Sequence, residues 1–77
     1  MKFKWEKVLG PTIGEKVDAK AFWLRALKVT RGDWFWRAAL CDLARTGVED
    51  ISGHARSLSA AQLQAERAAK WLGRNVP

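Results

Sequence analysis

The stretch AFWLRALKVTRGDWFWRAALCDLA, residues 21–44, decides the fold of this chain. Its two apolar segments, residues 21–29 and 34–44, flank the turn sequence Thr30-Arg31-Gly32-Asp33. If both segments are strands they form a hairpin, in which Gly32 supplies the positive φ that a tight turn requires. If both are helices they form an equally regular pair, since a capping Asp precedes each segment and a Gly follows it.

Two features favour the strand interpretation. The aromatic run Trp34-Phe35-Trp36 follows the turn directly, and aromatic residues are typical of strands. Residues 51–57 carry small side chains on alternate positions, which suits a short strand that a helix approaches closely. Residues 2–8 alternate polar and apolar side chains, the period of a half-buried strand, and residues 12–20 are predicted as a loop or an irregular strand.

The segment that begins at Ser59 is predicted as a helix. Ser59 and Gln62 form a capping-box pattern, and Leu58 and Leu63 have the spacing of a hydrophobic staple. Gly73 is predicted to end the helix. A narrow stripe of small residues follows the helical period along one face; its members are Ala61, Ala65, Ala68, Ala69 and Leu72. Because this stripe contributes little volume, the five tryptophans have to fill the core from the opposite layer.

These elements predict one domain over residues 1–77, because a chain of 77 residues holds a single core. The predicted class is α+β: an antiparallel sheet of three to four strands with one C-terminal helix packed on one face. An all-α three-helix bundle is the alternative, since the chain is rich in Ala and Leu.

The hairpin also predicts which side chains share a face, if its loop is even-numbered. The bulkier face is assigned to the core and holds Trp23, Arg25, Leu27 and Val29 beside Trp34, Trp36, Ala38 and Leu40. Arg25 then lies at the core margin or pairs with a carboxylate such as Asp42. The other face holds Phe22, Leu24, Ala26 and Lys28 beside Phe35, Arg37, Ala39 and Cys41. One helix covers one side of the sheet, so this second face is predicted either to bind a partner or to be covered by residues 2–8, residues 10–20 or a second copy.

The charge of the chain points to an anionic partner. The net charge is +6, and most of it lies in residues 1–37, which carry nine Lys or Arg against four Asp or Glu. A concentrated excess of this kind favours nucleic acid or an acidic surface, although an ordinary solvated surface has a similar charge. The predicted contacts for nucleic acid or a partner protein are Lys2, Lys4, Lys7, Phe22, Lys28, Phe35, Arg37 and Trp71.

The composition argues against catalysis and metal binding. The single Cys41 excludes an internal disulfide, and the single His54 leaves no histidine pair for a metal ion or a proton relay. We therefore predict a non-enzyme with no cofactor and no metal site. No apolar stretch approaches the ~18 residues of a membrane span, and the charged first residues do not resemble a signal peptide, so a cytoplasmic location without membrane contact is expected.

The segment SGHARSLSAAQ, residues 52–62, running into AERAA, residues 65–69, resembles the tail of small phage- and prophage-encoded proteins. In these an aromatic hairpin precedes a Gly-x-Ala-x-Ser strand and an Ala-rich helix. The order of elements is also similar to integrase-type arm-binding domains, to AP2-type domains and to the back half of double-stranded-RNA-binding domains. The resemblance implies a phage-derived, intracellular, non-catalytic accessory protein.

Three functions follow as expectations. The first is nucleic-acid binding through the basic and aromatic sheet face. The second is a protein–protein interaction module, such as an inhibitor of a host complex, that uses the same face together with Trp71. The third is a structural homodimer that buries this face.

Overall fold

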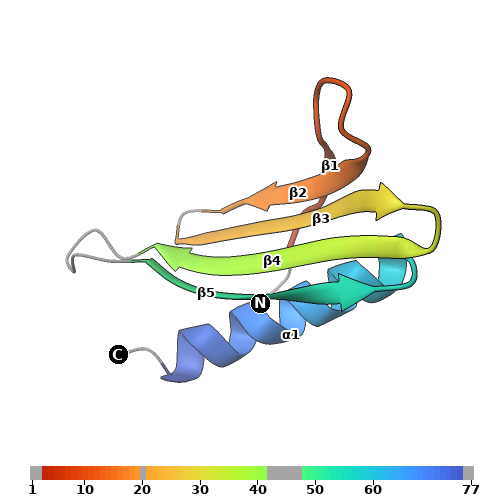
Figure 1. Ribbon diagram of the computed structural model, residues 1–77. Coiled ribbons are helices and arrows are strands. Elements are labelled where there is room, and N and C mark those ends of the chain that lie inside the picture. Colours follow the sequence, from red (N-terminus) through yellow and green to blue (C-terminus); the bar gives the residue numbers. More distant parts are fainter. Residues whose placement is uncertain (1–2, 20, 42–47, 76–77) are drawn as a thin grey trace.

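The computed structural model describes residues 3–19, 21–41 and 48–75. Within these residues, five antiparallel strands form one sheet in chain order, and one C-terminal helix packs on one side of it (Figure 1). The strands are β1 (Glu6–Lys7), β2 (Gly14–Asp18), β3 (Phe22–Thr30), β4 (Asp33–Cys41) and β5 (Val48–Ala55), and the helix is α1 (Leu58–Asn75).

The α+β class and the C-terminal helix are confirmed, and residues 21–41 form a hairpin rather than a helical pair. The predicted number of three to four strands is wrong. Within the described residues 3–8, the strand predicted over residues 2–8 is limited to Glu6–Lys7. The segment predicted as a loop or an irregular strand contains β2, which pairs with β3 along its whole length.

The turn between β3 and β4 shifts the register of the hairpin by one residue. Gly32 has the positive φ of 76° that the turn predicts. Thr30 pairs with Asp33, but the next pair is Lys28 with Trp34, so Val29 is an extra residue of the bulge type. Side chains alternate between the two faces of a strand. One extra residue therefore places each β3 side chain before Val29 on the face opposite to the one that even-loop pairing predicts.

The face assignment predicted for β3 is therefore wrong, although that for β4 holds. Phe22, Leu24 and Ala26 are buried beneath the helix, in register with Leu40, Ala38 and Trp36. The sequence predicts four side chains of β3 for the core. Trp23, Arg25 and Leu27 instead lie on the side away from the helix, and Val29, at the register shift, is exposed.

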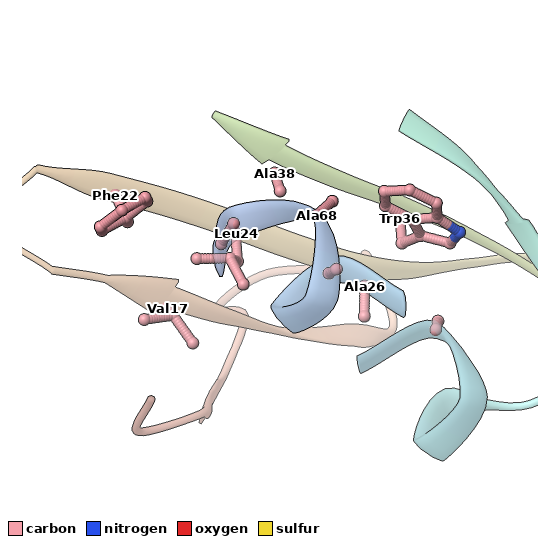
Figure 2. Packing of buried hydrophobic residues seen from close by; sticks show 10 residues of the cluster. Val17, Phe22, Leu24, Ala26, Trp36, Ala38 and Ala68 are labelled. Atoms are coloured by element: carbon pink, nitrogen blue, oxygen red, sulfur yellow. The ribbon is translucent and has the colours of Figure 1, made fainter. Parts of the chain in front are cut away.

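The core is thin because the helix presents alanine to the sheet (Figure 2). Ala61, Ala65 and Ala69 are fully buried and pack against larger side chains of β2, β3 and β4. The sheet supplies Val17, Phe22, Leu24, Ala26, Trp36 and Ala38 to this layer. Leu24 is the largest fully buried side chain, and burial of such a side chain stabilises the fold by about 1.5–3 kcal/mol. The predicted alanine stripe is thus confirmed.

Two tryptophans fix the flanks of the helix. The Trp36 indole N–H donates to Gln64 Oε1 over 2.9 Å, and the Trp5 indole N–H donates to Glu66 Oε2 over 2.6 Å. The Trp36 indole also occupies the space above Gly53 in β5, where an added Cβ would lie 2.8 Å from the ring. The small residue in β5 therefore makes room for a tryptophan side chain beside the helix.

The helix begins earlier and ends later than the sequence predicts. Ser57, rather than Ser59, is the N-cap: its Oγ accepts the Ala60 N–H over 3.2 Å, and its carbonyl accepts the Ala61 N–H over 3.0 Å. Gly73 does not end α1, which continues to Asn75.

Candidate binding face of the sheet

The side of the sheet away from α1 is here called the open face. By strand register it carries Glu6, Lys16, Asp18, Trp23, Arg25, Leu27, Asp33, Phe35, Arg37, Ala39, Asp50, Ser52 and His54. Its apolar members Trp23, Leu27 and Phe35 are half-buried, and Ala39 is only 2% exposed although the helix lies on the other side. The side chains of the open face therefore shield one another.

Two arginines share one tryptophan at the centre of the open face. Arg25 and Arg37 stand directly opposite each other on β3 and β4. The guanidinium carbon of Arg25 lies 3.9 Å from the centre of the Trp23 ring, and that of Arg37 lies 5.2 Å from it. Both distances are within the range of cation–π attraction.

Carboxylates at the rim balance these cations. Asp18 pairs with Arg25 at 3.0 Å and with Lys16 at 2.9 Å, and Asp50 accepts hydrogen bonds from Arg37. The hydrogen bond from Lys16 lowers the pKa of the Asp18 carboxyl, and Arg25 lowers it further. Arg25 also donates to the carbonyls of Leu24 and Val17, at 2.8 and 3.4 Å, so its charge is satisfied on the open face. Asp42, the partner predicted for it, lies outside the described residues.

A second group surrounds Phe35. His54 on β5 lies edge-on to the Phe35 ring, with centroids 5.5 Å apart. Its Nδ1 lies 2.8 Å from Asp33 Oδ1. These three side chains occupy the open face near the β3–β4 turn and are exposed enough to contact a ligand.

The cross-strand arginine pair is an unusual arrangement. Like charges directly opposite each other destabilise a sheet, so stability alone would favour a different residue at one of the two positions. Here Trp23, Asp18 and Asp50 compensate the repulsion between Arg25 and Arg37. Sites that break a local rule and compensate it with neighbouring groups are where function is expected.

The residues predicted as contacts do not all meet on this face. Phe35 and Arg37 lie on it. Phe22 is a core residue only 8% exposed, and Lys28 is exposed but lies on the helix side of β3, because the register shift at Val29 exchanged the two faces. The register shift at Val29 also places Trp23 and Arg25 on the open face. An even-numbered hairpin loop, the premise of the sequence-based face assignment, would place both on the core face.

The remaining predicted contacts are elsewhere. Lys7, in β1, and Lys4, just before it, are both exposed, and Lys2 lies outside the described residues. Trp71 is 50% exposed on α1. Their binding roles stay predictions.

A hollow of about 300 Å³ lies on the helix side of the sheet, beneath the β1–β2 hairpin. It is lined by Lys7, Val8, Thr12, Ile13, Gly14, Glu15, Trp34 and Leu58. Its lining brings together one cation, one carboxylate and one hydroxyl group, from Lys7, Glu15 and Thr12. Among residues 3–19, 21–41 and 48–75, no group of three or more His, Cys, Asp or Glu is placed to hold a metal ion. In the same residues no helix has the length and apolarity that a membrane span needs.

Comparison with protein-family models, with curated proteins and with solved structures finds no match for this chain.

Proposed function

We propose that this chain is a non-catalytic accessory protein that binds single-stranded nucleic acid on the open face of its sheet. The observation that carries the proposal is the pair of opposed arginines, Arg25 and Arg37, held on the Trp23 ring. A phosphate beside the two guanidinium groups relieves their repulsion and accepts hydrogen bonds from the N–H groups that face it.

The neighbouring side chains support the proposal. Bases stack on aromatic rings and on guanidinium planes, and the open face offers Phe35 together with the two arginines. Asp18 and Asp50 are about half exposed, at 49% and 42%. Ion pairs made by exposed carboxylates contribute little to stability, so a phosphate can replace a carboxylate at little cost. The net charge of +6 attracts a polyanion from a distance.

A protein partner is the second candidate, and the composition of the face favours it. Trp and Arg are enriched among the residues that dominate binding energy at protein interfaces, and both lie at the centre of the open face. Asp18 and Asp50 show that a carboxylate already fits against each arginine, so an acidic protein segment would be recognised in the same way.

The test is fluorescence anisotropy with labelled single-stranded DNA, single-stranded RNA and duplex DNA, first at low salt and then in a salt titration. We expect the single strands to bind more tightly than the duplex. Each phosphate contact with a single strand contributes a slope of about −0.7 to the plot of log affinity against log salt, so Arg37→Ala should lower the slope by about that amount.

Two variants serve as controls. Arg67→Ala removes the same charge from an exposed position on α1 and should leave binding nearly unchanged. Asp50→Asn removes the carboxylate that competes for Arg37 and should tighten binding. The proposal fails if no probe binds at low salt, or if Arg67→Ala weakens binding as much as Arg37→Ala does. In that case, capture of a protein from nuclease-treated lysate that depends on Arg37 would favour the second candidate.

A further inference from the structure

The two edges of the sheet differ in how well they are protected. At one edge β1 has only two residues, both charged, and the preceding Phe3 and Trp5 pack against the core. At the other edge β5 has eight residues and contains neither Lys nor Pro, which commonly protect edge strands. Within the described residues, β5 pairs with β4 alone, and no loop or turn bonds to its outer side.

We infer that β5 is the pairing edge for a second copy of this chain, so that the two sheets join into one. The charges of the strand favour a copy of itself as the occupant. Asp50 lies near the start of β5 and His54 near its end, with Arg56 just after the strand. Antiparallel pairing of two identical strands therefore places the acidic end of each beside the basic end of the other.

Pairing about Ser52 gives the most complementary register. Ser52 then stands opposite the Ser52 of the second copy, and Asp50 stands opposite His54. In this register each even-numbered residue of one β5 stands opposite an even-numbered residue of the other. Side chains of the open face in one copy are therefore paired with open-face side chains in the second copy. The helices of both copies then lie on the same side of the joined sheet, and the two open faces form one continuous surface.

Trp71 supplies a second, independent observation. Gln64 marks the flank of α1 that points toward β5, because it bonds Trp36, whose ring lies over Gly53. Trp71 is seven residues further on, two helical turns, and so lies on the same flank, where it is 50% exposed. Exposed tryptophan on the side of an unpaired edge is typical of an interface residue.

The spacing of the two helices explains why a large side chain stands there. α1 lies chiefly over β4, so its axis and that of the second copy would be about three strand spacings apart, or about 14 Å. Closely packed helices are about 8–10 Å apart. The two helices would therefore leave a space between them that alanine or serine side chains are too small to fill. One Trp71 side chain from each copy is large enough to fill it.

The test is the solution mass of the full chain by light scattering and sedimentation over a range of concentrations. We expect a species of twice the 8.7 kDa chain mass at high concentration, in buffer that contains no nucleic acid. Because the association is measured without nucleic acid and nucleic-acid binding is measured separately by anisotropy, failure of this inference and failure of the proposed function are distinguishable.

Ser52→Lys should abolish the association, since it places two like charges opposite each other on the twofold axis. Thr12→Lys, the same kind of change in the β1–β2 hairpin, should not affect it. Trp71→Ala should weaken the association by about tenfold or more. In a Cys41→Ser background, Ser52→Cys should form a dimer linked by a disulfide under mild oxidation, whereas Thr12→Cys should not.

The inference is overturned if the chain stays a monomer at its solubility limit. It is also overturned if a dimer forms that Ser52→Lys leaves intact, since such a dimer would use another surface. Circular dichroism of each variant establishes that loss of association is not loss of fold.

Discussion

Ala65 is fully buried between α1 and the sheet, and its small size sets how closely the two layers approach. Ala65→Leu adds three carbon atoms where the core has no room for them, so we expect it to lower the free energy of unfolding by about 1–3 kcal/mol. Urea denaturation measures this change. Ala19→Leu, at an exposed position, should stay within about 0.5 kcal/mol of the parent. Equal stability of the two variants would show that the layers are not closely packed.

Asp18 makes stability depend on pH in the acid range. Its pKa is lowered in the folded chain, first by the hydrogen bond from Lys16, so the unfolded chain binds this proton more readily. The stabilisation is therefore present above the ordinary carboxyl pKa and is lost as the pH falls through the lower pKa of the folded state. We expect an NMR titration to place the Asp18 midpoint below its ordinary value, and Asp18→Asn to flatten the pH dependence of unfolding. A midpoint at or above the ordinary value would contradict this.

Single residues also set the limit of what the sequence can predict. The aromatic run Trp34-Phe35-Trp36 and the small residues of 51–57 correctly favour a hairpin, and the predicted β4 face is correct. Which β3 side chains face the helix depends on whether Val29 pairs with a residue of β4. The local sequence does not distinguish a two-residue loop from the same loop flanked by a one-residue bulge. Composition could have decided: burying Phe22 and Leu24 instead of Trp23 and Arg25 avoids an interior arginine.

The helix start is where an element departs most clearly from its predicted bounds. Ser57 accepts the Ala60 N–H, whereas Ser59 is already helical. Ser57→Ala should therefore cost about 1 kcal/mol of stability, and Ser59→Ala should cost much less. Thermal or urea unfolding of the two variants measures the difference. A larger loss of stability in Ser59→Ala than in Ser57→Ala would show that Ser59 is the N-cap.

Elements with a strong period are predictable, and polar ones are not. The alanine stripe of α1 follows a period of 3.6 residues, and every predicted member is buried. The β2 sequence Gly-Glu-Lys-Val-Asp contains one apolar side chain, Val17, and its strand character comes from pairing with β3. Such a strand forms because a neighbour offers its hydrogen bonds and the core buries Val17, information that lies outside the segment.

Across the whole molecule, protection from exchange should follow the position of each strand in the sheet. β3 and β4 are paired on both sides and carry fully buried residues such as Leu24, Ala26 and Ala38, so their amides should exchange most slowly. The two residues of β1 should exchange fastest among the strands. NMR-detected hydrogen exchange measures this order, and equal protection of β1 and β3 would contradict the described pairing.

The unpaired Val29 restricts how this hairpin can change over evolutionary time. Gaining or losing one residue at the bend would reverse the phase of β3, turning Phe22 and Leu24 toward water and Trp23 and Arg25 toward alanine. A change of two residues preserves the phase. Lineages that diverge from this chain are therefore free to alter the bend only in steps of two, or by moving the odd residue to another place.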